Sequence, residues 1–108
     1  MATYIALVTF TDQGIRNIRQ TTERAKELVN IASKLGIKVS DIYWTMGAFD
    51  AVFRAEAPDD EAMTALALGM GSIGNIRTQT MRAFSAEEIE KILSKLPSTS
   101  IFSGTNAR

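Results

Sequence analysis

The spacing of apolar residues along the chain predicts a strand, a helix, a two-stranded hairpin, a second helix and a further strand, in that order. The first apolar run, Tyr4–Phe10, places aliphatic residues on both parities, which is typical of a strand buried on both faces. A short helical turn is expected around Ile15 and Ile18. Apolar residues then recur at helical spacing over Thr22–Leu35, and Gly36 follows as a residue that can adopt the left-handed cap.

The middle of the chain has the pattern of a β-hairpin. Strands are expected over residues 37–46 and 49–57, because aromatic and β-branched residues alternate on both sides of Gly47. A two-residue turn at Gly47 and Ala48 pairs the last residue of one strand with the first residue of the next. The length of this turn therefore predicts the register of the whole hairpin.

That register sorts the hairpin side chains onto two faces of the sheet. The face expected to be covered by helices, with Trp44 and Phe53 in the core, carries Ser40, Ile42, Trp44, Phe49, Ala51, Phe53 and Ala55. The face expected to stay open carries Asp41, Tyr43, Thr45, Asp50, Val52, Arg54 and Glu56. Asp41 then lies opposite Arg54, and an opposite-charge pair of this kind contributes about 0.2 to 1 kcal/mol.

The second half of the chain predicts two more helices and one strand. Asp59 is expected to cap a helix whose first turn carries further carboxylates, and a strand is expected over residues 76–84. Ser85 and Glu88 have the spacing of a capping box at the start of a third helix. We expect that helix to dock on another surface, because its apolar residues form a single stripe: Ile89, Ile92, Leu93 and Leu96.

This order of elements is the ferredoxin-like βαββαβ arrangement, an α+β fold in which two helices cover one face of an antiparallel four-stranded sheet. The sequence predicts one such domain over residues 1–96, which includes an added C-terminal helix, and a flexible polar tail over residues 97–108. The other face of the sheet is expected to be bare. Such a face has to be solvated, bind a ligand or meet another subunit.

Composition narrows the choice of partner. A domain of 108 residues with 45% hydrophobic composition can build a core, but it buries only about 60 to 70% of its unfolded surface. An apolar sheet face is therefore stabilised when a second copy buries it, and we expect a homo-oligomer.

The charges of the twelve basic and twelve acidic residues cancel, so nucleic acid is not an expected partner. RNA binding on the sheet has little support, since Val52, Arg54 and Glu56 stand where stacking aromatics are needed.

The chain contains neither Cys nor His. This excludes thiolate nucleophiles, His-dependent triads, ordinary zinc sites and haem ligation by imidazole or thiolate. The adjacent carboxylates of Asp59, Asp60 and Glu61 are explained by helix capping, so we expect no metal and no cofactor. The lack of a secretory or transmembrane segment predicts a cytoplasmic protein that does not bind membranes.

The open face holds the candidate site residues. A carboxylate, a cation and a phenol on one concave surface could bind a small molecule or act as general base and anion holder. The residues expected to share that surface are Tyr43, Asp50, Arg54, Glu56, Thr80 and Arg82. The alternative is structural: Arg54 pairs with Asp41 or Glu56 inside a subunit interface, as buried charges usually do.

Four separated segments of the chain, residues 4–14, the hairpin, 57–61 and 75–84, closely resemble the GYD-domain family. The resemblance extends from Thr3 to about Leu96. The Gly, Tyr and Asp after which the family is named correspond here to Gly47, Phe49 and Asp50, so the tyrosine position lacks its hydroxyl.

The resemblance implies a small protein of the dimeric α/β barrel type, in which two sheets meet through their open faces. It implies no particular reaction, because this wider group includes cofactor-independent oxygenases, isomerases, haem-degrading enzymes and proteins without assigned activity. The first hypothesis is thus a non-enzymatic homo-oligomer that encloses a small molecule. The second is an oxygenase or isomerase in which Asp50 or Glu56 takes a proton, Arg54 or Arg82 holds the anion and Tyr43 positions the substrate.

Overall fold

The structure is a computed structural model and describes residues 1–97. Its elements follow the predicted order, with a short helix and a 3-10 turn inserted before the first long helix. They are β1 (Ala2–Phe10), α1 (Asp12–Arg16), η1 (Ile18–Gln20), α2 (Thr21–Lys34), β2 (Lys38–Trp44), β3 (Ala51–Ala57), α3 (Asp60–Ile73), β4 (Ile76–Ala83) and α4 (Ala86–Leu93).

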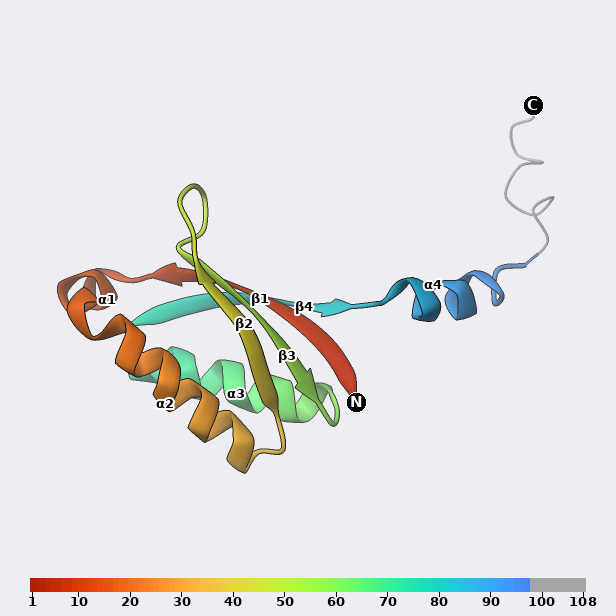
Figure 1. Ribbon diagram of the computed structural model, residues 1–108, viewed down its shortest axis with the longest axis horizontal. Coiled ribbons are helices and arrows are strands. Elements are labelled where there is room, and N and C mark those ends of the chain that lie inside the picture. The colour runs from red at the N-terminus through yellow and green to blue at the C-terminus, as the bar shows by residue number, and fades with distance from the viewer. Residues whose placement is uncertain (98–108) are drawn as a thin grey trace.

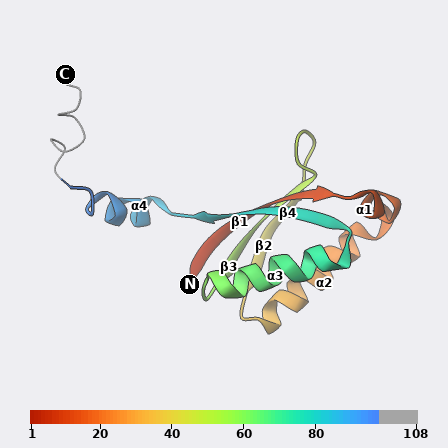
Figure 2. The same cartoon turned by 180° about the vertical axis from the view of Figure 1, so that it is seen from behind.

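The four strands form one sheet in the order β2-β3-β1-β4, and every neighbouring pair is antiparallel. Each long helix connects two strands between which a third strand is inserted, which is the split βαβ connection of the ferredoxin-like fold. Both α2 and α3 lie on the same side of the sheet (Figure 1), and the view from behind shows the same arrangement (Figure 2). The predicted α+β, ferredoxin-like class is therefore confirmed.

The core lies between the sheet and these two helices. On the covered face of the sheet the side chains are mostly small, and larger residues from the helices fill the space above them. The residues that are buried from the sheet side are Tyr4, Ala6, Val8, Val39, Ala51, Phe53, Ala55 and Ala57; those from the helices and loops include Ala32, Ile37, Met63, Leu66 and Met70. Alanines let helix and sheet approach closely, so the packing is dense without many large side chains.

The helix ends are formed as the sequence predicts. Gly36 adopts a left-handed φ of 75° after α2, and the Asp59 carboxylate accepts a hydrogen bond from the Ala62 N–H at 2.8 Å at the start of α3. Ser85 and Glu88 form the complete capping box at the start of α4. These caps satisfy backbone groups that have no partner within the helix.

The turn of the hairpin is wider than the predicted two residues. β2 already ends at Trp44 and β3 begins at Ala51, so the loop covers residues 45–50. Thr45 closes it, because its N–H donates to the Asp50 carbonyl at 2.8 Å and its Oγ1 donates to the Phe49 carbonyl at 2.6 Å. The prediction was wrong because Gly47, at φ 116°, turns at the tip of a longer loop instead of closing a tight turn.

A β-bulge in β2 changes the predicted faces of that strand. Tyr43 lies opposite Val52 as expected, but Ser40 lies opposite Arg54 because one extra residue is inserted between them. Asp41 adopts a positive φ of 54° at this point, a conformation that Asp tolerates better than most side chains. Ser40 therefore lies on the open face and not on the covered face, and Val39 is buried in its place.

The predicted ion pair survives this change of register. The Arg54 guanidinium lies 2.9 Å from the Asp41 carboxylate, although its cross-strand neighbour is now Ser40. Both side chains are about half exposed, so the pair contributes little to stability, at most about 1 kcal/mol.

α4 extends from the end of β4 away from the rest of the domain (Figure 1). Within residues 1–97 it forms no extensive contact with another helix or strand, so the predicted docking surface for this helix is not found within the chain. Apart from Pro97, the predicted tail over residues 97–108 lies outside the described residues. In the part of the chain that is described, no helix is long and apolar enough to cross a membrane.

Candidate functional site

The open face of the sheet carries an apolar stripe with polar margins. Cross-strand neighbours share a face, and the register places Ile5 beside Met81 and Leu7 beside Val52. We call these four residues the open-face stripe. Ile5, Leu7 and Val52 are partly exposed and Met81 is 46% exposed, because neither long helix lies on this side of the sheet (Figure 1). The stripe is continuous across three strands, which is the pattern of a surface that a partner covers.

Three of the predicted site residues flank this stripe. Tyr43, Arg54 and Glu56 lie on the open face, since Tyr43 is the cross-strand neighbour of Val52, and Arg54 and Glu56 follow Val52 along β3 by two and four residues. Tyr43 is 63% exposed, whereas Arg54 is engaged by Asp41 and donates a further hydrogen bond to the Ser40 hydroxyl at 3.3 Å. The phenol is thus available to a ligand or subunit, and the guanidinium already has two partners.

Asp50 lies directly before the first residue of β3, and its carboxylate accepts a hydrogen bond from the backbone. Its Oδ2 accepts a hydrogen bond from the Phe10 N–H at 2.8 Å, and the Asp50 N–H donates to the Val8 carbonyl at 2.8 Å. These two bonds join the hairpin loop to the end of β1 beyond the regular strand pairing. The motif aspartate therefore has a structural role that the sequence reasoning missed, because its partner Phe10 lies 40 residues away and no local pattern indicates the bond.

Thr80 and Arg82 do not lie on the open face, which corrects the prediction. The register pairs Thr80 with Ala6 and Arg82 with Tyr4, and both partners belong to the covered face. The face of β4 could not be read from its sequence, because polar and apolar residues occur on both parities of this edge strand. The predicted site is consequently divided between two sides of the sheet.

Arg82 takes part in a different cluster at the edge of β4. Its guanidinium lies 5.6 Å from the centre of the Tyr4 ring and 4.6 Å from that of Phe84, and 3.6 Å from the Glu88 carboxylate. The Tyr4 hydroxyl donates a hydrogen bond to the Asp60 carboxylate. That bond, followed by burial, raises the pKa of the Tyr4 phenol above its usual range.

Beside this cluster lies a shallow cavity of about 340 Å³ between β4 and α3. Its lining includes Tyr4, Asp60, Thr80 and Arg82. The charged groups and the phenol of the cluster already contact one another, so the arrangement joins α3 and α4 to the sheet. Among the described residues, no group of acidic side chains is placed to hold a metal ion.

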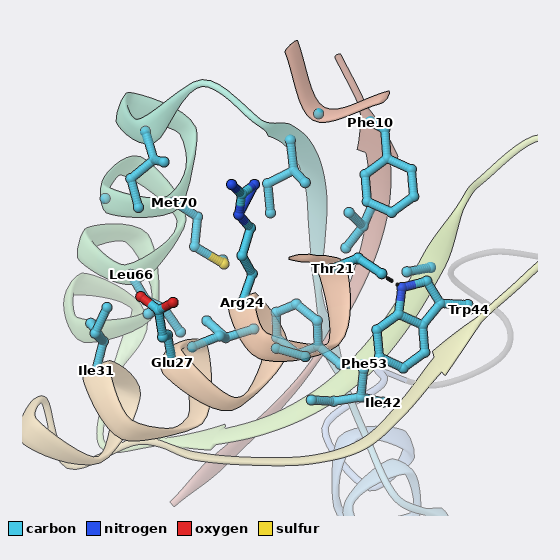
Figure 3. Close-up of a pocket in the computed structure, with 18 of the residues that line it drawn as sticks. Phe10, Thr21, Arg24, Glu27, Ile31, Ile42, Trp44, Phe53, Leu66 and Met70 are labelled. Carbon is cyan, nitrogen blue, oxygen red and sulfur yellow. Dashed lines mark hydrogen bonds between the residues drawn. The ribbon is translucent and has the colours of Figure 1, made fainter. Parts of the chain in front are cut away.

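A second, more apolar hollow lies on the helix side. A groove of about 400 Å³ runs between α2 and α3, with β1 and β3 as its floor (Figure 3). We call it the α2–α3 groove, and its principal lining residues are Phe10, Thr21, Arg24, Leu28, Ile31, Ile42, Trp44, Phe53, Ala65, Leu66, Gly69, Met70 and Ile73. The lining is predominantly apolar, and its size falls within the range typical of binding sites.

Trp44 belongs to the wall of this groove and not to the core, contrary to prediction. It is 44% exposed, and its indole Nε1 donates a hydrogen bond to Thr21 Oγ1 at 3.0 Å, whereas Phe53 is 2% exposed and is core as predicted. Arg24 extends into the space between α3 and the sheet (Figure 3). Neither of the two ion pairs within residues 1–97 involves it.

The sequence reasoning missed this groove because it assumed that the two helices cover the sheet completely. A signal was present: Ile31, Leu35 and Ile73 are apolar positions at the margins of the helical stripes and are 41% to 61% exposed. Apolar side chains there indicate a surface between helices that the domain leaves unfilled.

Comparison with known proteins agrees with this architecture. The family model described as "GYD domain" matches residues 4–93, which run from β1 to the end of α4. A curated protein of Thermus thermophilus, "Glutamine synthetase and cystathionine beta-lyase binding protein", is 30% identical over 90 residues. That alignment covers 82% of this chain and 95% of the relative. Since the match includes the sheet, both long helices and α4, the chain belongs to the GYD domain family.

Proposed function

We propose that this protein is a non-catalytic binding protein that self-associates through its open sheet face and, as a homo-oligomer, binds other proteins. The observation that carries the proposal is the open-face stripe of Ile5, Leu7, Val52 and Met81, which no long helix covers. A second copy provides the same stripe, so two such faces are complementary in chemistry and can bury each other around a two-fold axis. Burial of apolar area of this kind drives most subunit association.

Protein partners are supported by the name of the Thermus relative, which describes it as a binding protein for two enzymes. We therefore propose metabolic enzymes as partners, with glutamine synthetase and cystathionine β-lyase as the first candidates. A cytoplasmic location forms part of this proposal. It is supported by the absence of cysteine, since the chain needs no oxidising compartment.

A small molecule enclosed between the two mated faces is a further element of the proposal. Tyr43, Arg54 and Glu56 would surround it at the margin of the stripe. The oxygenase or isomerase hypothesis has less support from the geometry, because Arg82 lies on the other face and the Asp50 carboxylate binds the Phe10 N–H. Of its candidate groups, Glu56, Arg54 and Tyr43 remain together on the open face.

Native mass spectrometry tests the self-association. We expect the wild-type chain to give a dimer or larger assembly, and Leu7→Glu to shift it to a smaller one, because a carboxylate cannot be buried without a partner. Met81→Glu is the milder variant, since this position is on an edge strand. Leu68→Glu is the matched control, because Leu68 is 69% exposed on α3, away from the open face. This substitution should leave the number of subunits in the assembly unchanged.

The same spectra report any small molecule that stays bound to the assembly. Biosensor titration with purified glutamine synthetase and cystathionine β-lyase of the same cell tests the partners. Binding of either enzyme by the assembled protein supports the proposal. A wild-type chain that is monomeric at micromolar concentration, or an assembly whose size is unchanged by Leu7→Glu in the folded protein, contradicts the role of the open face.

A further inference from the structure

α4 is an amphipathic helix without a docking surface in its own chain. Its apolar side chains Ile89, Ile92, Leu93 and Leu96 are 39% to 57% exposed, and its other side carries mainly charged residues. Hydrogen bonds from the N–H groups of Lys95 and Leu96 extend the last turn, so that all four apolar residues stay on one stripe. α4 belongs to the region matched by the family model, and it is therefore part of the domain.

A helix of this length is not stable by itself. α4 contains eight residues, whereas isolated helices shorter than about 12 to 15 residues are marginal in water. The capping box stabilises only its first turn. The sequence thus encodes the start and the apolar stripe of a helix whose remaining stability has to come from packing against another surface.

The α2–α3 groove has the shape that such a helix needs. Its two walls are helices that leave a space between them over the sheet (Figure 3). On the α3 wall the lining residues Ala65 and Gly69 are small, and a Cβ added at Gly69 meets nothing within 4 Å. Small residues allow the axis of a third helix to approach closely. The wall from Ala65 to Ile73 is about 12 Å long, and the stripe from Ile89 to Leu96 about 10 Å.

α4 cannot reach the groove of its own chain. Only Phe84 and Ser85 connect it to β4, and two residues span at most about 7 Å. α3 packs over β4 and α2 over β2, so that α3, which is about 10 Å wide, lies between the end of β4 and the groove. α4 also extends away from the groove past the end of the sheet (Figure 2). The groove can therefore receive this helix only from another molecule.

We propose that α4 of one copy docks in the α2–α3 groove of a second copy, with the apolar stripe against Trp44, Ile73 and the small residues of α3. Reciprocal exchange between two copies forms a closed assembly. Charge is consistent with this occupant: Arg24 extends into the groove without an ion pair in the described chain, and Glu90 borders the stripe on α4. In the docked arrangement the Glu90 carboxylate of one copy lies near the Arg24 guanidinium of the other.

Disulfide trapping between two differently labelled chains tests the exchange directly. The chain has no cysteine, so a Leu93→Cys variant and an isotope-labelled Gly69→Cys variant introduce the only thiols. After mixing and mild oxidation, we expect a disulfide between one light and one heavy chain. Lys91→Cys is the matched control, because this position is on the opposite side of α4; its yield should be about tenfold lower, since a disulfide requires Cα atoms within about 7 Å.

Filling the groove tests the same contact without thiol chemistry. Gly69→Phe places a ring in the groove, while Gly71→Phe adds the same ring to α3 at a position that does not line it. We expect Gly69→Phe to weaken association at least about tenfold and to remove hydrogen-exchange protection of residues 89–93, which is the signature of a short helix that lacks packing. Gly71→Phe should change neither quantity.

This exchange uses a different surface from the open-face stripe, so the two proposals can fail separately. If Leu7→Glu abolishes the sheet contact but the mixed disulfide still forms, the exchange of α4 is supported alone. An absence of mixed disulfides under conditions where the wild-type chain is assembled overturns the exchange, as does an equal yield from Lys91→Cys. Disulfides formed only within single chains of a doubly substituted variant also overturn it.

Discussion

The two faces of the central strands carry aliphatic side chains of different size. The face covered by α2 and α3 carries four alanines, Ala6, Ala51, Ala55 and Ala57, beside the larger Tyr4, Val8 and Phe53. The face without a helix carries the larger aliphatic residues Ile5, Leu7 and Val52. In an isolated domain the larger apolar side chains belong on the covered side, because their burial contributes more free energy.

This distribution of side-chain size indicates that the sheet is suited to burial on both sides. Small residues on the helix side allow close packing of α2 and α3, and the space between these helices forms the α2–α3 groove. The larger residues on the other side are partly exposed, and they form the surface that the proposed second copy would cover. The contribution of the side chains buried between the sheet and the two long helices should thus be independent of protein concentration, and that of the open-face stripe should depend on it.

Phe53→Ala should give the largest effect of any single change in the sheet. Phe53 is 2% exposed, and its truncation leaves a cavity under both helices, so we expect a loss of about 3 to 5 kcal/mol in the free energy of unfolding. Urea denaturation measures it. The loss should be the same at low and high protein concentration, and a strong dependence on concentration would contradict the division between the two faces.

Leu7→Ala should cost about 2 kcal/mol in the assembled protein and less than about 1 kcal/mol in the dilute monomer, because only the assembly buries this side chain completely. Denaturation curves at protein concentrations a hundredfold apart measure the difference. An equal cost at both concentrations would show that no second copy covers the open-face stripe.

Asp50→Ala should destabilise the fold by about 1 to 2 kcal/mol, because it leaves the Phe10 N–H without its acceptor. Asp50→Asn keeps an acceptor oxygen and should recover part of that loss. Chemical denaturation of both variants measures the structural role of Asp50, and titration with any copurified small molecule measures a role in ligand binding. Loss of ligand with unchanged stability would assign Asp50 to a site on the open face.

Tyr4→Phe should have the smallest effect at neutral pH, about 1 kcal/mol, and a larger one on the alkaline side. The pKa of Tyr4 is raised from its usual 10.0 by the hydrogen bond to Asp60 and by burial, so the folded state holds the phenol proton more tightly than the unfolded state. This stabilisation is fully present below pH 10 and is lost as the pH rises through the higher pKa of the folded state.

Thermal unfolding from about pH 8 to about pH 11 measures this loss of stability at alkaline pH. The wild-type melting temperature should fall above about pH 10, whereas Tyr4→Phe should remove that part of the decrease. Tyr43→Phe is the matched control, because Tyr43 is 63% exposed in the single chain whereas Tyr4 is buried. A decrease that persists unchanged in Tyr4→Phe would show that other groups cause it.

Several features were determined by the local sequence. The order and type of the elements follow from the apolar periodicity and from the helix caps. The predicted helix starts are found at Asp59 and Ser85, and a predicted helix end at Gly36, because a capping side chain or a positive φ acts only on backbone a few residues away. The membership of Ile5 and Leu7 in a strand was also readable from the apolar run, whereas the predicted burial of both faces is not found in the single chain, where Ile5 and Leu7 are partly exposed.

The tertiary structure alone decided the distribution of the candidate site. One inserted residue at Asp41 moved Ser40 to the open face, and the pairing of β4 with β1 placed Thr80 and Arg82 on the covered face. Both outcomes depend on register between strands distant in sequence, and a shift of one residue reverses every side chain. The α2–α3 groove and the isolated position of α4 likewise arise from how whole elements pack, which periodicity within a single element does not encode.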